Sequence, residues 1–122
     1  MANPDFKITS EQIQHEDKAV TVFHLRGWVD AQSENGFFSA AETAHSQGTR
    51  YLVVNLEDVQ MLTSAGIRVL QKIYKLYLSP EISGLKICSA PPQVYHSLAL
   101  TGFLQTVPMY ENLQAALTAY DM

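Results

Sequence analysis

The alternation of apolar and polar residues along the chain predicts several short strands. Five segments have the periodicity of a strand or a continuous apolar run: 6–9, 19–25, 51–56, 85–88 and the region around Thr106 and Val107. The charged residues 15–18 predict a tight turn, so the first two strands should pair antiparallel. Residues 51–56 are almost all apolar, which is typical of a strand covered on both faces. We expect that strand near the middle of the sheet.

Apolar residues at three- and four-residue intervals predict four helices. These helices begin near residues 33, 64, 91 and 113 and end near residues 45, 78, 101 and 120. Gly48, Pro80 and Gly102 follow the first three as stop signals. The order of elements predicts an α/β fold, a single domain over residues 1–122 in which about four helices pack on a mixed central β-sheet of four or five strands.

Composition and charge exclude several classes of protein. The chain has 122 residues, 47% of them apolar, which is enough for a core without covalent or metal cross-links. With 12 acidic and 8 basic side chains its formal charge is −4, and the basic residues are dispersed, so no direct contact with nucleic acid is expected. No apolar run approaches the ~20 residues of a membrane span, and no signal peptide is recognisable. We therefore expect a cytoplasmic protein without a membrane span.

The residue types that usually carry catalysis or bind metals are scattered. The histidines at positions 15, 24, 45 and 96 have no metal-ligand spacing to one another and are interpreted as structural or surface side chains. The single cysteine, Cys88, lies in an apolar segment, as an unreactive core thiol would. The glycines occur singly and form no phosphate-binding loop. We expect no enzyme activity, no metal site and no cofactor.

The most informative segment follows the predicted strand at 51–56. A short loop is expected at 57–62, and the second helix begins at Thr63 and Ser64, beyond the carboxyl end of a central strand. Open α/β sheets usually carry their functional groups at that edge. At about 100° per residue, four side chains lie within about 80° of one another, opposite the apolar stripe of this helix. They are Ser64, Arg68, Lys72 and Lys75. Ser64 should therefore face solvent at the head of a basic stripe.

Two interpretations of this helix start are open. In the first, the hydroxyls cap free backbone N–H groups, and the basic stripe is a solvated surface. In the second, Ser64 accepts a phosphate, whose charge of about −2 would lie at the positive end of the helix dipole, one turn from Arg68. Such a phosphate would reverse the charge of the local surface and release a partner. The two interpretations are compatible if Thr63 caps the helix and Ser64 is exposed.

Three groups of residues carry a family resemblance: LRGWVDA at 25–31, LEDVQMLTSAGIRVL at 56–70, and the C-terminal segments PPQV, LTGF and YENLQAAL. They resemble the STAS-domain family, in particular its small stand-alone bacterial members, the anti-sigma factor antagonists. Residues 25–31, LRGWVDA, are similar to the family's G-x-(apolar)-D-A turn after the second strand. Residues 56–70, LEDVQMLTSAGIRVL, are similar to its LSGV-x-x-x-(S/D)-S-(A/S)-G-L-x-V-L signature, in which the phosphorylated serine corresponds to Ser64. The segments PPQV, LTGF and YENLQAAL resemble its C-terminal third. Together the three groups extend across nearly the whole chain.

The resemblance implies a partner switch. In that family the unphosphorylated domain binds an anti-sigma factor that is also a serine kinase, and so frees the sigma factor. Phosphorylation by the kinase, here at Ser64, ends the binding, and a metal-dependent serine phosphatase restores it. The kinase supplies ATP and the catalytic groups, so the resemblance implies no cofactor and no chemistry for this chain itself.

The resemblance also implies a partner-binding surface and shows where this chain departs from the family. The implied contact residues are Asp30, Asp58, Thr63, Ser64, Gly66, Arg68 and Lys72. Asp30 has a second interpretation, as the N-cap of the following helix. Thr63 replaces the family's Asp or Ser before the acceptor, which makes it an alternative acceptor. Glu57–Asp58 replaces Ser-Gly and adds two negative charges near the site, and Asn55 stands where the family commonly has aspartate.

Other functions and partners stay open from the sequence. The same fold could serve as a STAS subunit of a transporter ATPase or a signalling complex, with Ser64 as an exposed contact that is never phosphorylated. A small-molecule carrier or hydrolase would require an apolar pocket with convergent polar groups. Phe37 and Phe38 cannot both face the sheet, so one of them is a candidate contact for a partner or for a second copy in a homodimer.

Overall fold

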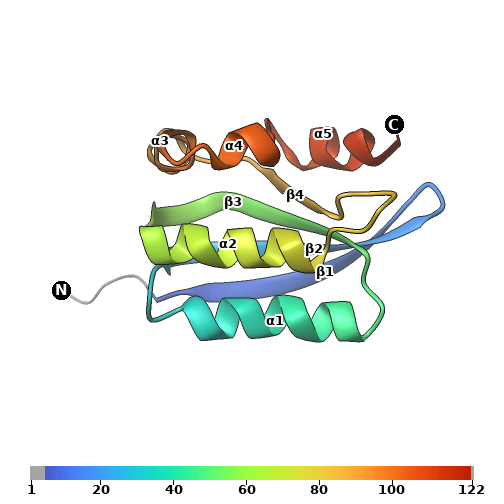
Figure 1. Ribbon diagram of the computed structural model, residues 1–122, viewed down its shortest axis with the longest axis horizontal. Coiled ribbons are helices and arrows are strands. Elements are labelled where there is room, and N and C mark those ends of the chain that lie inside the picture. Colours follow the sequence, from blue (N-terminus) through green and yellow to red (C-terminus); the bar gives the residue numbers. More distant parts are fainter. Residues whose placement is uncertain (1–4, 122) are drawn as a thin grey trace.

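The computed structural model describes residues 5–121, and its five strands form one mixed sheet (Figure 1). The strands are β1 Lys7–His15, β2 Lys18–Val29, β3 Tyr51–Leu62, β4 Leu85–Cys88 and β5 Met109–Tyr110. They lie in sequence order across the sheet. β1 and β2 pair antiparallel around the turn at 16–17, and every later pair is parallel. The mixed sheet, the antiparallel first pair and the central position of β3 are therefore confirmed.

The helices connect the parallel strands or follow the last of them, and they pack against the sheet. They are α1 Glu34–Ser46, α2 Ser64–Leu76, α3 Pro92–Leu100, α4 Phe103–Thr106, α5 Leu113–Thr118 and a final 3-10 turn, η1 Ala119–Asp121. Figure 1 shows α1 and α2 side by side, in contact with each other. Within residues 5–121, no helix has both the length and the hydropathy needed to cross a membrane.

The side chains of β3 alternate between two cores because successive residues of a strand point to opposite faces. Leu52, Val54 and Leu56 are fully buried in the larger core, with α1, α2 and α3. Val53 is fully buried in the smaller core, which also contains Cys88 and residues of α5. The strand is thus covered on both faces, as its apolar sequence predicts, and each such side chain contributes about 1.5–3 kcal/mol through burial. Burial also raises the pKa of the Cys88 thiol, as expected of an unreactive core residue.

The prediction of a strand at Thr106 and Val107 is wrong, because the strand begins a few residues later, at Met109. Residues 103–106 form the short helix α4, and the backbone N–H of Val107 still donates to the carbonyl of Phe103 at 2.9 Å. Val107 is extended because the proline that follows it disfavours the helical conformation. The chain then enters β5, whose two residues, Met109 and Tyr110, pair with β4.

The loop predicted at 57–62 is a continuation of β3. His24 of β2 is paired with Asn55, but Arg26 is paired with Asp58, so β3 has one extra residue there and forms a bulge. The side chain of Asn55 stabilises the bulge, because its Oδ1 accepts a hydrogen bond from the backbone N–H of Glu57 at 3.0 Å. Beyond the bulge the strand stays paired with β2 as far as Leu62 and leads directly into α2.

Candidate functional site

A shallow hollow lies where the segments that follow β2 and β3 meet. Because these two strands are parallel, both segments leave the sheet at the same edge. The hollow is lined by Asp30, Ala31, Gln32, Thr63, Ser64 and Ala65. Three of these, Asp30, Thr63 and Ser64, are residues that the sequence predicts for the site. Ala31, Gln32 and Ala65 are not, although each lies within two residues of a predicted one.

Thr63 is the N-cap of α2. Its backbone is extended, its Oγ1 accepts a hydrogen bond from the backbone N–H of Gly66 at 3.4 Å, and its hydroxyl donates to the carbonyl of Val29 at 3.3 Å. The backbone N–H of Thr63 donates to the same carbonyl at 3.1 Å. The Thr63 hydroxyl is therefore used both as donor and as acceptor, and it anchors the start of α2 to the end of β2.

Ser64 is the first residue of α2 and is exposed. Arg68, Lys72 and Lys75 are exposed on the same helix, whereas Ile67, Leu70 and Ile73 are buried in the core. The predicted solvent-facing basic stripe is therefore confirmed. The Ser64 hydroxyl lies at the helix end whose backbone N–H groups favour negative charge, and Arg68 follows one turn later.

The different roles of the two hydroxyls lead to a stability prediction. Thr63→Ala should lower the free energy of unfolding by about 1 kcal/mol, because it removes the N-cap of α2. Ser64→Ala should change it by less than about 0.5 kcal/mol, because an exposed side chain outside the cap contributes little. Urea denaturation of the two variants measures the difference. Equal losses would contradict the assignment of the cap to Thr63.

Asp30 closes the turn between β2 and α1. Its Oδ1 accepts hydrogen bonds from the backbone N–H groups of Gln32 at 3.0 Å and Ser33 at 3.2 Å, and its own N–H donates to the Ser33 hydroxyl at 2.8 Å. The N-cap of α1 is Ser33, so the interpretation of Asp30 as the cap is wrong. The half-buried carboxylate of Asp30 instead lines the same hollow as Ser64.

Two other predicted contact residues lie away from the exposed surface of the hollow. Gly66 is buried against the end of β2, where a Cβ atom would lie 2.4 Å from the carbonyl oxygen of Val29. Asp58 is exposed, but with Glu57 it lines a separate groove beside Arg26 and the start of α3. The bulge and the strand beyond it move the acidic pair out of the predicted loop, so these two charges do not line the hollow around Ser64.

Comparisons with known proteins identify the family and the fold. Residues 11–116 match the model of the STAS domain. An anti-sigma F factor antagonist of Paenibacillus polymyxa is 24% identical over 106 residues, which cover 86% of this chain and 90% of that protein. A solved anti-sigma factor antagonist from Mycobacterium paratuberculosis is 28% identical, with a TM-score of 0.80 over 95% of this chain and 96% of that chain. The Bacillus cell fate determinant SpoIIAA, solved in its phosphorylated form, shares the fold at 16% identity, with a TM-score of 0.67 over 93% of this chain and 99% of that chain.

Proposed function

The chain belongs to the STAS domain family, and from that membership we propose that it acts as an anti-sigma factor antagonist under the control of phosphorylation at Ser64. Two proteins named anti-sigma factor antagonists are similar to this chain, one over 86% and one over 95% of its length. This similarity supports the proposed role as an anti-sigma factor antagonist. The observation that carries the proposed control by phosphorylation is the difference between the two hydroxyls at the start of α2. Thr63 holds the helix, and the neighbouring hydroxyl of Ser64 is exposed and free to be modified.

In the proposed switch, the unphosphorylated protein binds an anti-sigma factor that is also a serine kinase, and a sigma factor is released. The Ser64 oxygen then attacks the γ-phosphorus of ATP held by the kinase, the bond to ADP breaks, and the hydroxyl proton passes to a base of the kinase. A metal-dependent serine phosphatase reverses the modification with water. This chain contributes the hydroxyl and the surface around it.

The electrostatics of the hollow support release after phosphorylation. A phosphate of about −2 charge on Ser64 is tolerated by the fold, because it lies at the N-terminal end of α2 and one turn from Arg68. The same phosphate adds to the charge of the Asp30 carboxylate, which lines the same hollow. A partner surface that packs against the neutral hydroxyl offers no counter-charge to a phosphate, and burying an unpaired charge in an interface costs several kcal/mol.

A hydrolase at this position is less well supported. A serine nucleophile needs an adjacent base, usually an imidazole, within hydrogen-bonding reach. Among the described residues that line the hollow there is neither a histidine nor a cysteine. The alternative of a STAS subunit that never switches predicts the same exposed Ser64 but no phosphate on it, so modification of Ser64 distinguishes the two.

A binding experiment with matched variants tests the proposed contact surface. The unphosphorylated protein is titrated into each serine-kinase anti-sigma factor of the source organism, and we expect one of them to bind and release its sigma factor. Gln32→Arg, in the hollow, should weaken that binding by at least about tenfold through steric and charge mismatch. Gln105→Arg, at a glutamine of α4 that is also exposed, should leave it unchanged. If no such factor binds, the proposed function is wrong. If both variants bind like the parent protein, the hollow is not the contact surface.

A further inference from the structure

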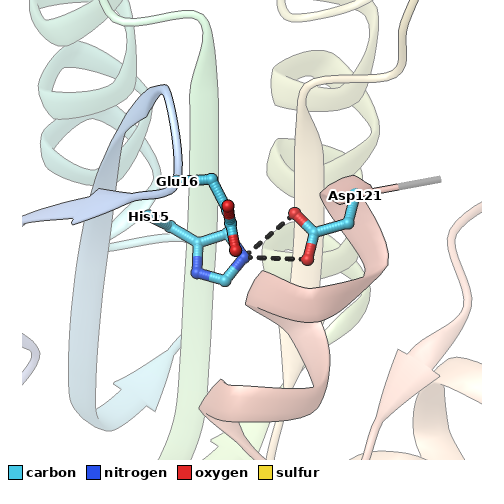
Figure 2. Close-up of side chains that lie close together, drawn as sticks. All are labelled: His15, Glu16 and Asp121. Carbon is cyan, nitrogen blue, oxygen red and sulfur yellow. Dashed lines mark hydrogen bonds and ion pairs between the residues drawn. The ribbon is translucent and has the colours of Figure 1, made fainter.

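A histidine and two carboxylates meet at the opposite end of the sheet from Ser64. His15 is the last residue of β1, Glu16 lies in the turn that follows, and Asp121 belongs to η1 at the end of the described chain (Figures 1 and 2). One ligand atom from each of the three side chains lies within 4.8 Å of the other two. The spacing between histidines gives no sign of this cluster, because its members are brought together only by the fold.

The distances between His15 and Asp121 match those between two ligands of one metal ion. Nε2 of His15 lies 3.1 Å and 3.3 Å from the two carboxylate oxygens of Asp121. Two ligand atoms bound to one transition-metal ion at about 2.0–2.1 Å each are separated by about 2.9–3.4 Å. In Figure 2 the Glu16 carboxylate lies beside the His15 ring, and because Glu16 is exposed, its side chain can turn toward the same point.

The backbone holds the first two of these ligands in place. His15 ends β1 and is paired with Lys18, and only 15% of its side chain is exposed. Asp121 follows Tyr120, whose buried hydroxyl donates to the carbonyls of Gly84 at 2.6 Å and Leu52 at 3.2 Å. Asp121 itself is 37% exposed, so an ion can enter from solvent. The nearby ammonium of Lys18 is paired with Asp17 at 3.2 Å.

We propose that His15, Glu16 and Asp121 bind one divalent transition-metal ion of the Zn²⁺ class. One imidazole nitrogen with carboxylate oxygens suits Zn²⁺, Co²⁺ and Ni²⁺, whereas Mg²⁺ and Ca²⁺ prefer oxygen ligands alone. Three protein ligands leave a position for water.

Calorimetric titration of the untagged full chain with ZnCl₂, and in parallel with MgCl₂, tests the site. We expect one Zn²⁺ per chain and a rise of the thermal midpoint with Zn²⁺. Mg²⁺ should not bind at the same concentration. His15→Gln and Asp121→Asn should each weaken Zn²⁺ binding by more than about tenfold, since even outer-shell partners of a metal are worth about 10–100-fold. His96→Gln, at an exposed histidine of α3, should not change it.

Two results would contradict the proposed metal site. No heat and no shift of the thermal midpoint with Zn²⁺ would exclude binding, and unchanged affinity in both His15→Gln and Asp121→Asn would place any bound ion elsewhere. Circular dichroism of each variant verifies that a loss of binding is not a loss of folding. The site lies at the far end of the sheet from Ser64, so the outcome is independent of the proposed partner switch.

Discussion

Gly66→Ala is expected to destabilise the protein by about 3 kcal/mol, near the upper end of the effects of overpacking a core. A Cβ atom at this position would lie 2.4 Å from the carbonyl oxygen of Val29, 2.7 Å from Cδ1 of Leu62 and 2.9 Å from Cγ1 of Val29. The Val29 carbonyl cannot retreat without cost, because it also accepts hydrogen bonds from the N–H and hydroxyl of Thr63. The substitution should therefore weaken the helix cap that positions Ser64.

Gly36→Ala is the matched control for this prediction. Gly36 is also a helical glycine, in α1, but a Cβ atom there would meet no other atom within 4 Å. Alanine should stabilise the protein by up to about 1 kcal/mol, because glycine loses more backbone entropy in a helix. Denaturant midpoints of the two variants provide the measurement. If Gly66→Ala proved as stable as Gly36→Ala, the close contact between α2 and β2 would be wrong.

Ser64→Asp is expected to weaken binding of the anti-sigma factor by about 100-fold or more, because the complex would bury a permanent negative charge for which the partner surface holds no counter-charge. Ser64→Ala should bind within about threefold of the parent protein, a difference below about 1 kcal/mol. Titration calorimetry with the partner measures both affinities. The folded state should tolerate the aspartate, since a carboxylate in the first turn of a helix is stabilising by about 0.3–1 kcal/mol.

Ser39→Asp separates a local effect from a general effect of charge. Ser39 is an exposed serine of α1, so its replacement changes the net charge by the same amount as Ser64→Asp. We expect unchanged affinity for the anti-sigma factor. Equal weakening by both substitutions would mean that overall charge, and not the hollow at Ser64, controls the partner.

The parts of the fold that follow local patterns could be predicted from the sequence. The apolar stripe of α2 predicts both its buried face and its exposed basic face, and the start signal at Thr63 and Ser64 predicts the helix start. The second half of β3 could not be predicted, because the apolar run ends at Leu56 and the later pairing depends on β2 and on the Asn55 side chain at the bulge. The two-residue strand β5 is too short to leave a pattern.

The site, too, follows partly from local sequence patterns and partly from contacts between distant residues. The exposure of Ser64 follows from its place on the helix, and so could be predicted. The burial of Gly66 and the turn closed by Asp30 depend on contacts with β2 and with Ser33, which the sequence does not reveal. The cluster of His15 with Asp121 joins residues 106 positions apart, and only the pairing of β1 with β2 and the anchoring of η1 bring them together.

Phosphate transfer to Ser64 is the most direct test of the proposed switch. The protein is incubated with each serine-kinase anti-sigma factor of the source organism and ATP, and the modified position is located by tandem mass spectrometry. We expect one phosphate, on Ser64 and not on Thr63, and the phosphorylated protein should no longer bind the factor that modified it. A phosphate on Thr63 instead, full binding after phosphorylation at Ser64, or no phosphate with any of these kinases would contradict the proposed function.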